Sequence, residues 1–396
     1  MTPPIGFCPG FKAAGIAAGI KKNGRPDIGL LLSDTPATVA GMFTTNRVQA
    51  APVHLDRERI TGGICRAVVV NSGNANCCTG KQGLADASET ARLAAERLDL
   101  PPEQVLVAST GVIGQPLPMA AIAAAMPALT DALAADGWGA FARAIMTTDT
   151  VPKTVVQSGK LGGAPFTIAA AAKGAGMIRP DMATMLCFVC TDARVAPGDL
   201  QTMLQTAVTG SFNRITIDGD TSTNDTVLLM AGAAGPAAVS SPADREVFQT
   251  ELDGVLLALA RMMVRDGEGV TKMAEVVVQG AASDPDARRI ADTVAESPLV
   301  KTALFGQDAN WGRILAAAGR AGAALDPDRV DLYFDDVKMV SAGVGCGAEA
   351  EDRATRVLQQ PELVITLDLR LGSGRASVLT CDFSLDYVRI NADYRS

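Results

Sequence analysis

Hydrophobic runs recur along the first half of the chain, and each ends at a Gly, Ser, Asn or Asp or at a charged residue. Some runs alternate with polar residues and others are continuous, which is typical of strands that are buried on one or both faces. The clearest predicted strands are residues 28–33, 65–73, 104–110, 165–173 and 184–192. Buried strands of this kind indicate at least one sheet in the core.

Other segments carry their hydrophobic positions at helical spacing. Several open with Ser, Asp or Pro, which are favoured where a helix begins. The clearest predicted helices are residues 86–98, 118–133, 197–208, 242–264 and 287–304. Because such helices separate many of the strands, the pattern predicts a mixed α/β chain with layered sheets.

The length of 396 residues favours two or three packed units over one core. Two stretches rich in Pro, Gly and Asp, near residues 280 and 330, interrupt the second half of the chain with predicted turns. They predict a smaller C-terminal α/β domain roughly within residues 280–390.

Composition narrows the class of protein. Hydrophobic residues make up 48% and charged residues 20%, as in globular proteins. The net charge is −8 and no Lys/Arg stripe interleaved with aromatic residues is present, which argues against nucleic acid as a partner. The basic residues near the start follow a short apolar stretch, the reverse of a secretory signal, and no apolar run reaches membrane-spanning length. We therefore expect a cytoplasmic protein that does not bind membranes.

The histidine and cysteine content of the chain argues against several kinds of catalytic site. The only histidine, His54, has no neighbouring catalytic residue types, so a Ser-His-Asp or Cys-His system is not expected. Cys187 and Cys190 have the spacing of a zinc or redox motif, but further ligands are lacking, so we interpret them as strand core and expect no metal. No dinucleotide or phosphate-binding loop has the required spacing.

A threonine at a chain terminus needs no histidine, because its own α-amine, with a pKa near ~8, can take the hydroxyl proton. The segment AAKGAGMIRPDMATMLCFVCTDA offers such a threonine, since a Gly-rich loop containing Gly174 and Gly176 runs into the strand that begins at Thr184. Attack of Thr184 Oγ on the Ala183 carbonyl, followed by hydrolysis of the ester, would give fragments 1–183 and 184–396. From these residues alone, an ordinary Gly-rich turn into a buried strand remains the favoured alternative.

Nine further segments, in this order, carry a resemblance to a known family: GFKAAGIAAGIKKNGRPDIGLL, AGMFTTNRVQAAPV, NSGNANCCTG, STGVIGQPLPM, MTTDTVPK, KGAGMIRPDMATMLCF, FNRITIDGDTSTNDT, GQDANWGRI and DYVRINADYRS. Over nearly its whole length the chain resembles the ornithine acetyltransferase family, the bifunctional glutamate N-acetyltransferases of arginine biosynthesis. The resemblance implies a two-domain α/β sandwich protein, a self-processed enzyme with an N-terminal threonine nucleophile. It also implies that the two fragments stay together in an α2β2 heterotetramer.

The resemblance assigns roles to particular residues. Thr184 matches the nucleophile after the cleavage site at Ala183, and Thr110 and Gly111 match the pair that supplies the oxyanion hole. The positions that bind the amino-acid substrate are Thr147, Lys173, Thr184, Glu268, Asn391 and Ser396. A lysine and a carboxylate can orient the two ends of an amino acid. Lys173 is also expected to lower the pKa of the Thr184 amine by like-charge repulsion.

Two positions depart from the family pattern. Ser396 stands where the family commonly has threonine, and Cys77 stands where alanine is common. Neither is the predicted nucleophile or part of the predicted oxyanion hole.

The implied reaction is acetyl transfer from N2-acetyl-L-ornithine to L-glutamate through an acetyl-Thr184 intermediate, with no organic cofactor. Use of acetyl-CoA as a second donor stays open. Two alternatives remain: an autoprocessed aminopeptidase of related fold, which would send the acyl group to water, and a non-catalytic relative that binds the same metabolites.

Overall fold

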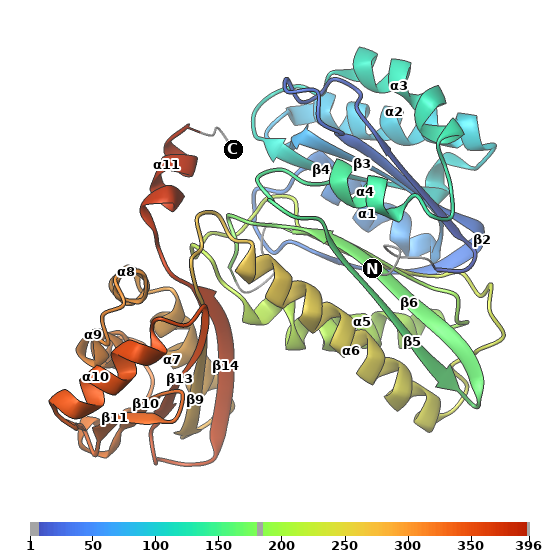
Figure 1. The fold of residues 1–396 in the computed structure, drawn as a ribbon. Coiled ribbons are helices and arrows are strands. Elements are labelled where there is room, and N and C mark those ends of the chain that lie inside the picture. Colours follow the sequence, from blue (N-terminus) through green and yellow to red (C-terminus); the bar gives the residue numbers. More distant parts are fainter. Residues whose placement is uncertain (1–7, 180–184, 394–396) are drawn as a thin grey trace. The chain divides into compact units, whose positions relative to one another are not determined.

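The computed structural model describes residues 8–179 and 185–393, and these residues form two compact units (Figure 1). The first unit contains the chain up to Asn213 together with residues 220–263. The second contains residues 214–219 and the described residues from 264 onward. The second unit thus begins before the range of 280–390 expected from the turn-rich stretches, and it includes a short segment from earlier in the chain.

An eight-stranded mixed sheet forms the centre of the first unit. Seven strands follow the order β4-β3-β2-β8-β7-β6-β5, and β1 pairs with β2. Their bounds are β1 Phe11–Ile16, β2 Ile28–Phe43, β3 Ile64–Asn74, β4 Val105–Val112, β5 Lys153–Leu161, β6 Ala164–Lys173, β7 Leu186–Thr191 and β8 Thr226–Ala231. Each of the five predicted strand segments therefore corresponds to a strand of this sheet.

The long strand β2 joins the two halves of the sheet. Residues 28–32 and 37–38 pair with β3, and residues 38–43 pair with β8. The register between β2 and β3 shifts between Leu32 and Ala37. Such an irregularity bends a strand and increases its twist. Only the first part, residues 28–33, was predicted as a strand, because the polar residues of the shift interrupt the hydrophobic run.

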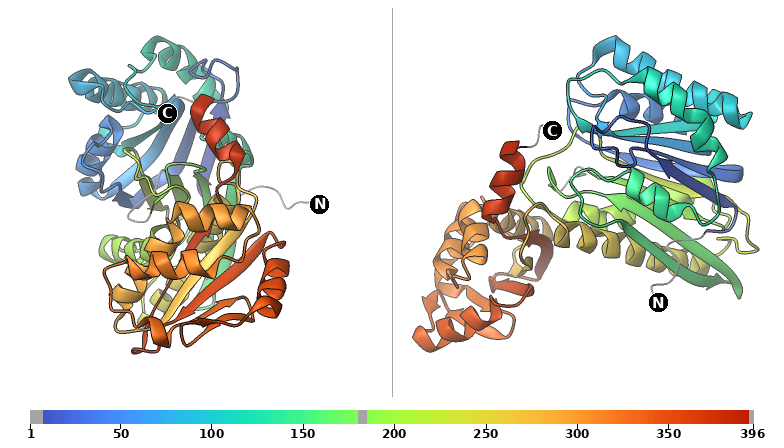
Figure 2. Two further views of the ribbon diagram at one scale, coloured as in Figure 1. Left: turned by 90° about the vertical axis from the view of Figure 1, so that its left-hand side faces the viewer. Right: turned by 45° about the horizontal axis from the view of Figure 1, so that its top comes forward.

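Helices cover the sheet of the first unit. They are α1 Ala51–Arg59, α2 Gly80–Leu98, α3 Met119–Asp131, α4 Trp138–Ala144, α5 Pro197–Gly210 and α6 Pro242–Arg265. In Figures 1 and 2, α2 and α3 lie side by side, and the pair contacts β1–β4. Short α4 packs against β1, β2 and β6, where Trp138, Phe141 and Phe188 form edge-to-face aromatic contacts in the core.

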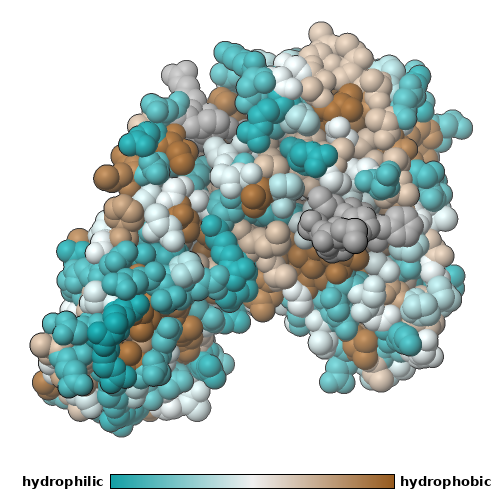
Figure 3. Space-filling view, viewed as in Figure 1, coloured by the Kyte–Doolittle hydropathy of each residue, from teal (hydrophilic) through white to brown (hydrophobic). Residues whose placement is uncertain are grey.

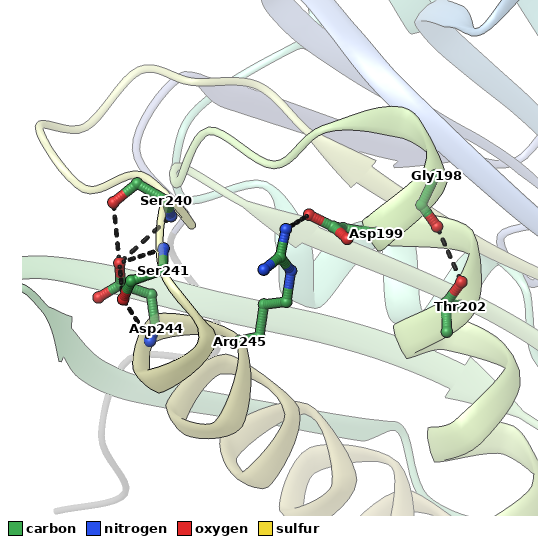
Figure 4. A network of polar contacts seen from close by, with 7 residues as sticks. All are labelled: Gly198, Asp199, Thr202, Ser240, Ser241, Asp244 and Arg245. Atoms are coloured by element: carbon green, nitrogen blue, oxygen red, sulfur yellow. Dashed lines mark hydrogen bonds and ion pairs between the residues drawn. The ribbon is translucent and has the colours of Figure 1, made fainter.

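A polar network fixes the start of α6 and ties it to α5 (Figure 4). The hydroxyl of Ser241 accepts a hydrogen bond from Asp244 N, while the Asp244 carboxylate accepts bonds from the backbone and hydroxyl groups of Ser240 and Ser241. This is a reciprocal N-terminal cap. Arg245 then pairs with Asp199 of α5 at 2.9 Å. These contacts explain the arrangement of the two helices and are not a candidate site.

The second unit has its own six-stranded sheet, in the order β12-β11-β10-β13-β9-β14. The strands are β9 Met273–Ala281, β10 Asp331–Phe334, β11 Val337–Ser341, β12 Val344–Gly345, β13 Glu362–Asp368 and β14 Gly374–Cys381. The helices are α7 Asp284–Ala295, α8 Pro298–Phe305, α9 Trp311–Gly319, α10 Ala348–Val357 and α11 Leu385–Asp393. Apolar residues of α7–α10 and of the sheet share one core.

The mixed α/β class with two sheets agrees with the prediction, and so do most helices, but residues 287–304 are not one helix. They form α7 and α8, which are separated at Glu296 and Ser297. The reason is Pro298, which disfavours the α conformation at the residue before it. Proline at the first position of α8 is instead compatible with a new helix start.

Cys187 and Cys190 are buried in β7, and within the described part of the chain no group of three potential ligands could hold a metal. Over the same residues, no helix has both the length and the apolar character needed to span a bilayer. The face in Figure 3 is largely hydrophilic with small hydrophobic areas. His54 is exposed on α1.

Candidate active site

The predicted oxyanion residues lie where β4 ends beside β3. Gly111 has a φ of 131°, a conformation that residues with a side chain rarely adopt. A Cβ at this position would lie 2.3 Å from the carbonyl carbon of Gly73 and 2.5 Å from Asn74 N. Glycine at position 111 is therefore required both by its backbone conformation and by the close approach of β3.

Lys173 comes to the same place from the end of β6. Its side chain is buried, and Nζ lies 3.3 Å from Thr110 Oγ1. Thr110 and Lys173 are 63 residues apart in the chain, so only the folding of the sheet brings the two side chains together. The structure thus places three predicted site residues, Thr110, Gly111 and Lys173, in one buried region of the first unit.

Asp149 joins Thr147 to this region. Its carboxylate accepts hydrogen bonds from Gly174 N at 2.8 Å and from Thr147 N at 3.0 Å. It also forms a fully buried ion pair with Lys153 Nζ at 2.7 Å. Through these bonds Asp149 holds the backbone on either side of the site, at Thr147 and just after Lys173.

The charges around Asp149 keep it ionised. Burial would raise the pKa of this carboxyl, but the positive charges of Lys173 and Lys153 and the hydrogen bonds from Lys153 and Gly174 hold the pKa well below its ordinary value. The sequence analysis did not single out Asp149 or Lys153. Both lie in the quoted segment MTTDTVPK, so the available signal was an acidic and a basic residue four positions apart in that segment.

Lys21 is a second lysine that the sequence analysis missed. Its Nζ donates to Pro26 O at 2.8 Å and to Met146 O at 2.7 Å, next to Thr147 in the chain. Burial lowers the pKa of Lys21 to about 8, and repulsion from Arg25 and Lys173 acts in the same direction. The site is therefore bordered by more positive charge than was predicted.

Asn224 supports the strand that carries the oxyanion residues. Its buried amide donates to Ala75 O at 2.7 Å and to Ser109 O at 2.8 Å, which links β3 and β4 just before Thr110. The Ser109 hydroxyl in turn donates to Asn71 at 2.6 Å. These side chains satisfy backbone groups where the strand ladder ends.

The loop between β6 and β7 begins and ends at this site, because Lys173 and Leu186 are paired neighbours on the two strands. Ala183 and Thr184 lie outside the described residues. Among the described residues of this loop, Gly174 has a φ of 159°, close to extended, and Met177 is left-handed, with a φ of 54°. The left-handed conformation of Met177 costs more than the same conformation would cost a glycine.

Glu268 and Asn391 meet in the second unit. Asn391 Nδ2 donates to Glu268 Oε2 at 2.8 Å and to Tyr387 O at 3.0 Å. Gly269 makes this approach feasible, since a Cβ there would lie 2.4 Å from Tyr387 N. Asn391 is exposed near the end of α11, and Ser396 lies outside the described residues.

The region around Thr110 offers a positively charged, largely buried environment with a strand end shaped by glycine. Such an arrangement can stabilise negative charge that develops on a reacting carbonyl oxygen and can bind a carboxylate. Within the described residues it contains no histidine and no group of metal ligands.

Known proteins resemble this chain over its full length. The family model described as "ArgJ family" matches residues 12–396. The arginine biosynthesis bifunctional protein ArgJ of Geobacter sulfurreducens is 56% identical over 389 residues, covering 98% of this chain and 99% of that protein. The protein of the same name from Symbiobacterium thermophilum is 52% identical over 400 residues, covering 100% of this chain and 98% of that protein. The crystal structure of the Bacillus halodurans protein of this name has a TM-score of 0.50 and 41% identity, and covers 52% of this chain and 98% of that chain.

Proposed function

Because this chain belongs to the ArgJ family, we propose that it is a glutamate N-acetyltransferase of arginine biosynthesis. It transfers the acetyl group of N2-acetyl-L-ornithine to L-glutamate and releases L-ornithine and N-acetyl-L-glutamate. The observation that carries this proposal is the buried meeting of Thr110, Gly111 and Lys173 beside the strand that follows Thr184. These are the side chains and the backbone that an acyl-transfer site without histidine needs.

The nucleophile is generated by self-cleavage between Ala183 and Thr184, giving fragments 1–183 and 184–396. The pairing of Lys173 with Leu186 supports this, since it holds the strand after the junction next to Lys173. The Bacillus halodurans chain supports it as well, because nearly all of that solved chain matches only 52% of this one. A share of this size is close to that of residues 184–396. We propose that both fragments remain together as an α2β2 heterotetramer.

Turnover then proceeds in two half-reactions. The Thr184 amine takes the proton of Oγ, which attacks the acetyl carbonyl of acetylornithine, and the oxyanion is stabilised at Thr110 and Gly111. Ornithine leaves and glutamate accepts the acetyl group from Thr184. Lys173 and Thr147 in the first unit, and Glu268, Asn391 and Ser396, bind the amino-acid groups of the substrates. No organic cofactor or metal takes part.

Thr184→Ala tests the nucleophile. We expect the chain to stay uncut in denaturing mass spectrometry and acetyl transfer to fall by about 10⁴-fold or more. Wild-type protein mixed with acetylornithine alone should show one added acetyl group on the fragment that begins at Thr184. An uncut wild-type chain with full activity would exclude this function.

The choice of substrates separates the remaining alternatives. Acetylornithine with glutamate as acceptor should give parallel double-reciprocal plots, as expected for a ping-pong mechanism. Hydrolysis of amino-acid amides in place of transfer would favour an aminopeptidase, and ligand binding without any turnover would favour a non-catalytic relative. Adding acetyl-CoA as an alternative donor shows whether the protein also acetylates glutamate directly.

A further inference from the structure

Two consecutive cysteines, Cys77 and Cys78, lie in the loop between β3 and α2. Their sulfur atoms are 3.8 Å apart, and they differ in access, because the side chain of Cys77 is buried and that of Cys78 is exposed. Burial also raises the pKa of the Cys77 thiol, which keeps it protonated and less reactive than an accessible thiol. An oxidant in solution can therefore reach one thiol, with a second thiol directly beside it. The proposed acetyl transfer uses neither.

Cys78 also lines a surface cavity of about 400 Å³. The cationic side chains of Arg47 and Lys81 and the imidazole of His54 line the same cavity, and all three residues are exposed. Among the described residues, no aspartate or glutamate lines it. A cleft lined by charges of one sign raises the local concentration of ions of the opposite sign. The cavity therefore favours an anionic oxidant at Cys78.

The loop that contains the two cysteines, residues 75–79, is bonded to the end of β4, which carries the predicted oxyanion residues. Ala75 N donates a hydrogen bond to Val112 O at 2.9 Å, and Gly114 N donates to Cys77 O at 2.9 Å. A change in the backbone conformation of Cys77 therefore acts on the backbone that directly follows the oxyanion residues.

Asn76 holds the same loop directly before the cysteines. Its backbone oxygen accepts a hydrogen bond from Ala51 N at 3.1 Å, and its buried amide donates to Gly83 O at 2.8 Å. These two bonds tie the loop to α1 and α2. Because Asn76 is fixed in this way, a distortion introduced between the two sulfur atoms is relieved mainly at the cysteines and at their hydrogen bond with Gly114.

We propose that Cys77 and Cys78 are a modification site, which an anionic low-molecular-weight disulfide oxidises to a disulfide between the two residues, lowering acetyl transfer through the end of β4. The Cys78 thiolate attacks one sulfur of the small disulfide, RSSR, and the released RS⁻ takes up the proton that Cys78 had lost. The Cys77 sulfur then attacks the Cys78 sulfur, and the second RS⁻ leaves with the Cys77 proton. Two protein thiols thus become one disulfide, and one RSSR becomes two RSH.

A disulfide between neighbouring residues distorts the backbone. The Cα atoms of a disulfide usually lie roughly 4.4–6.8 Å apart, whereas neighbouring Cα atoms are only about 3.8 Å apart. Joining the sulfur atoms of Cys77 and Cys78 therefore changes the backbone of both residues. Strained and exposed disulfides are readily reduced and are the ones that serve regulation. In a reducing compartment such a disulfide forms only transiently, as redox-sensing disulfides do.

The test treats the full-length protein with oxidised glutathione, an anionic disulfide. It compares the wild type with Cys77→Ala, Cys78→Ser and the control Cys346→Ser. Cys346 is the other exposed cysteine, and it has no cysteine next to it in the chain. Peptide mass spectrometry identifies the oxidised residues, and hydrogen exchange reports on the Gly114 amide. Steady-state assays give kcat and KM before and after reduction with dithiothreitol.

We expect the wild type and Cys346→Ser to lose two hydrogen atoms across Cys77 and Cys78, and their kcat to fall by about 10–10²-fold. Hydrogen exchange at residues 112–114 should become faster, because the bond to the Cys77 oxygen is weakened. Dithiothreitol should reverse all three changes. Cys77→Ala should stop at a glutathione adduct on Cys78, and Cys78→Ser should keep both its mass at this loop and its kcat.

The charge of the cavity gives a separate expected result. Lys81→Gln should slow oxidation by oxidised glutathione by about threefold or more and leave oxidation by the neutral bis(2-hydroxyethyl) disulfide unchanged. Lys160→Gln, which removes an exposed charge on β5, should change neither rate. An equal response of Lys81→Gln to the two disulfides would contradict the choice of an anionic oxidant.

A glutathione adduct on wild-type Cys78 that never becomes a disulfide overturns the inference. A disulfide that changes neither kcat nor hydrogen exchange at Gly114 overturns it too, and so does an equal loss of kcat in Cys78→Ser, since oxidation elsewhere would then be responsible. The effect on kcat rests on the proposed function, whereas the mass and the hydrogen exchange do not. If the reduced wild type transfers no acetyl group, the proposed function fails alone, and these two measurements still decide the inference about the cysteines.

Discussion

The family resemblance assigns both Lys173 and Glu268 to substrate binding, but their surroundings differ sharply. Lys173 is buried in the first unit, in the field of the ionised Asp149, which is itself held by an ion pair and two backbone hydrogen bonds. Glu268 in the second unit is bonded to the exposed Asn391. Charges removed from water interact strongly, whereas exposed charges are screened. We therefore expect the buried group around Asp149 and Lys173 to control both stability and rate, and the half-buried Glu268 with its exposed partner Asn391 to affect mainly affinity.

The largest effect should come from Asp149→Asn, which leaves the buried Lys153 without its carboxylate. Removing one partner of a buried pair typically destabilises a protein by about 3–5 kcal/mol. We expect a clearly lower melting temperature in a thermal unfolding assay. Asp386→Asn is the control, since it removes only the highly exposed pair with Arg389. Equal melting temperatures of the two variants would contradict the comparison.

Low pH should reduce the contribution of the same carboxylate, Asp149, to the stability of the fold. The folded pKa of Asp149 lies below its ordinary value of about 3.9. The stabilisation from this group is therefore complete above that value and is lost as the pH falls from it toward the folded pKa. We expect the stability difference between wild type and Asp149→Asn to shrink progressively below about pH 4 in denaturant unfolding experiments. If the stability difference grew as the pH fell, the pKa of Asp149 would be shifted in the opposite direction to the one assigned.

Lys173→Met should lower kcat by about 10²–10³-fold, the usual cost of losing one group that stabilises an oxyanion or fixes a substrate. Lys160→Met is the matched control, because Lys160 is exposed on the neighbouring strand β5. The steady-state rates with acetylornithine and glutamate provide the measurement. A loss of similar size in both variants would show that the effect does not depend on burial at the site.

The smallest effect is expected for Glu268→Gln. A half-buried charge whose partner Asn391 is exposed contributes modestly to binding, so KM should rise by about tenfold or less while kcat stays within about threefold. Glu349→Gln, on α10 of the same unit, should change neither constant. A large fall in kcat for Glu268→Gln would show that this residue contributes to rate as Lys173 does, and would contradict the contrast between the two regions.

Local patterns predicted most of the elements that build the sheet of the first unit. Hydrophobic runs located β3, β4, β6 and β7, and helical spacing located α5 and α6 within a few residues. The second unit was harder to predict, because its strands are short and its order depends on pairings between distant segments, such as β9 with β13. The continuation of β2 beyond residue 33 was missed for a local reason, the polar residues at its register shift.

By itself the sequence determined which chemistry is available: a single histidine, no metal motif, a threonine after a Gly-rich loop, and a family pattern over nearly the whole chain. Only the tertiary structure decided which groups act together. The contacts of Lys173 with Thr110, of Asp149 with Gly174 and of Asp225 with Met185 join residues 25 to 63 positions apart. Such contacts arise from strand pairing and burial. The buried lysines and hydrogen bonds around Asp149 also keep that carboxyl ionised, and residue order alone does not encode which groups surround a buried carboxyl.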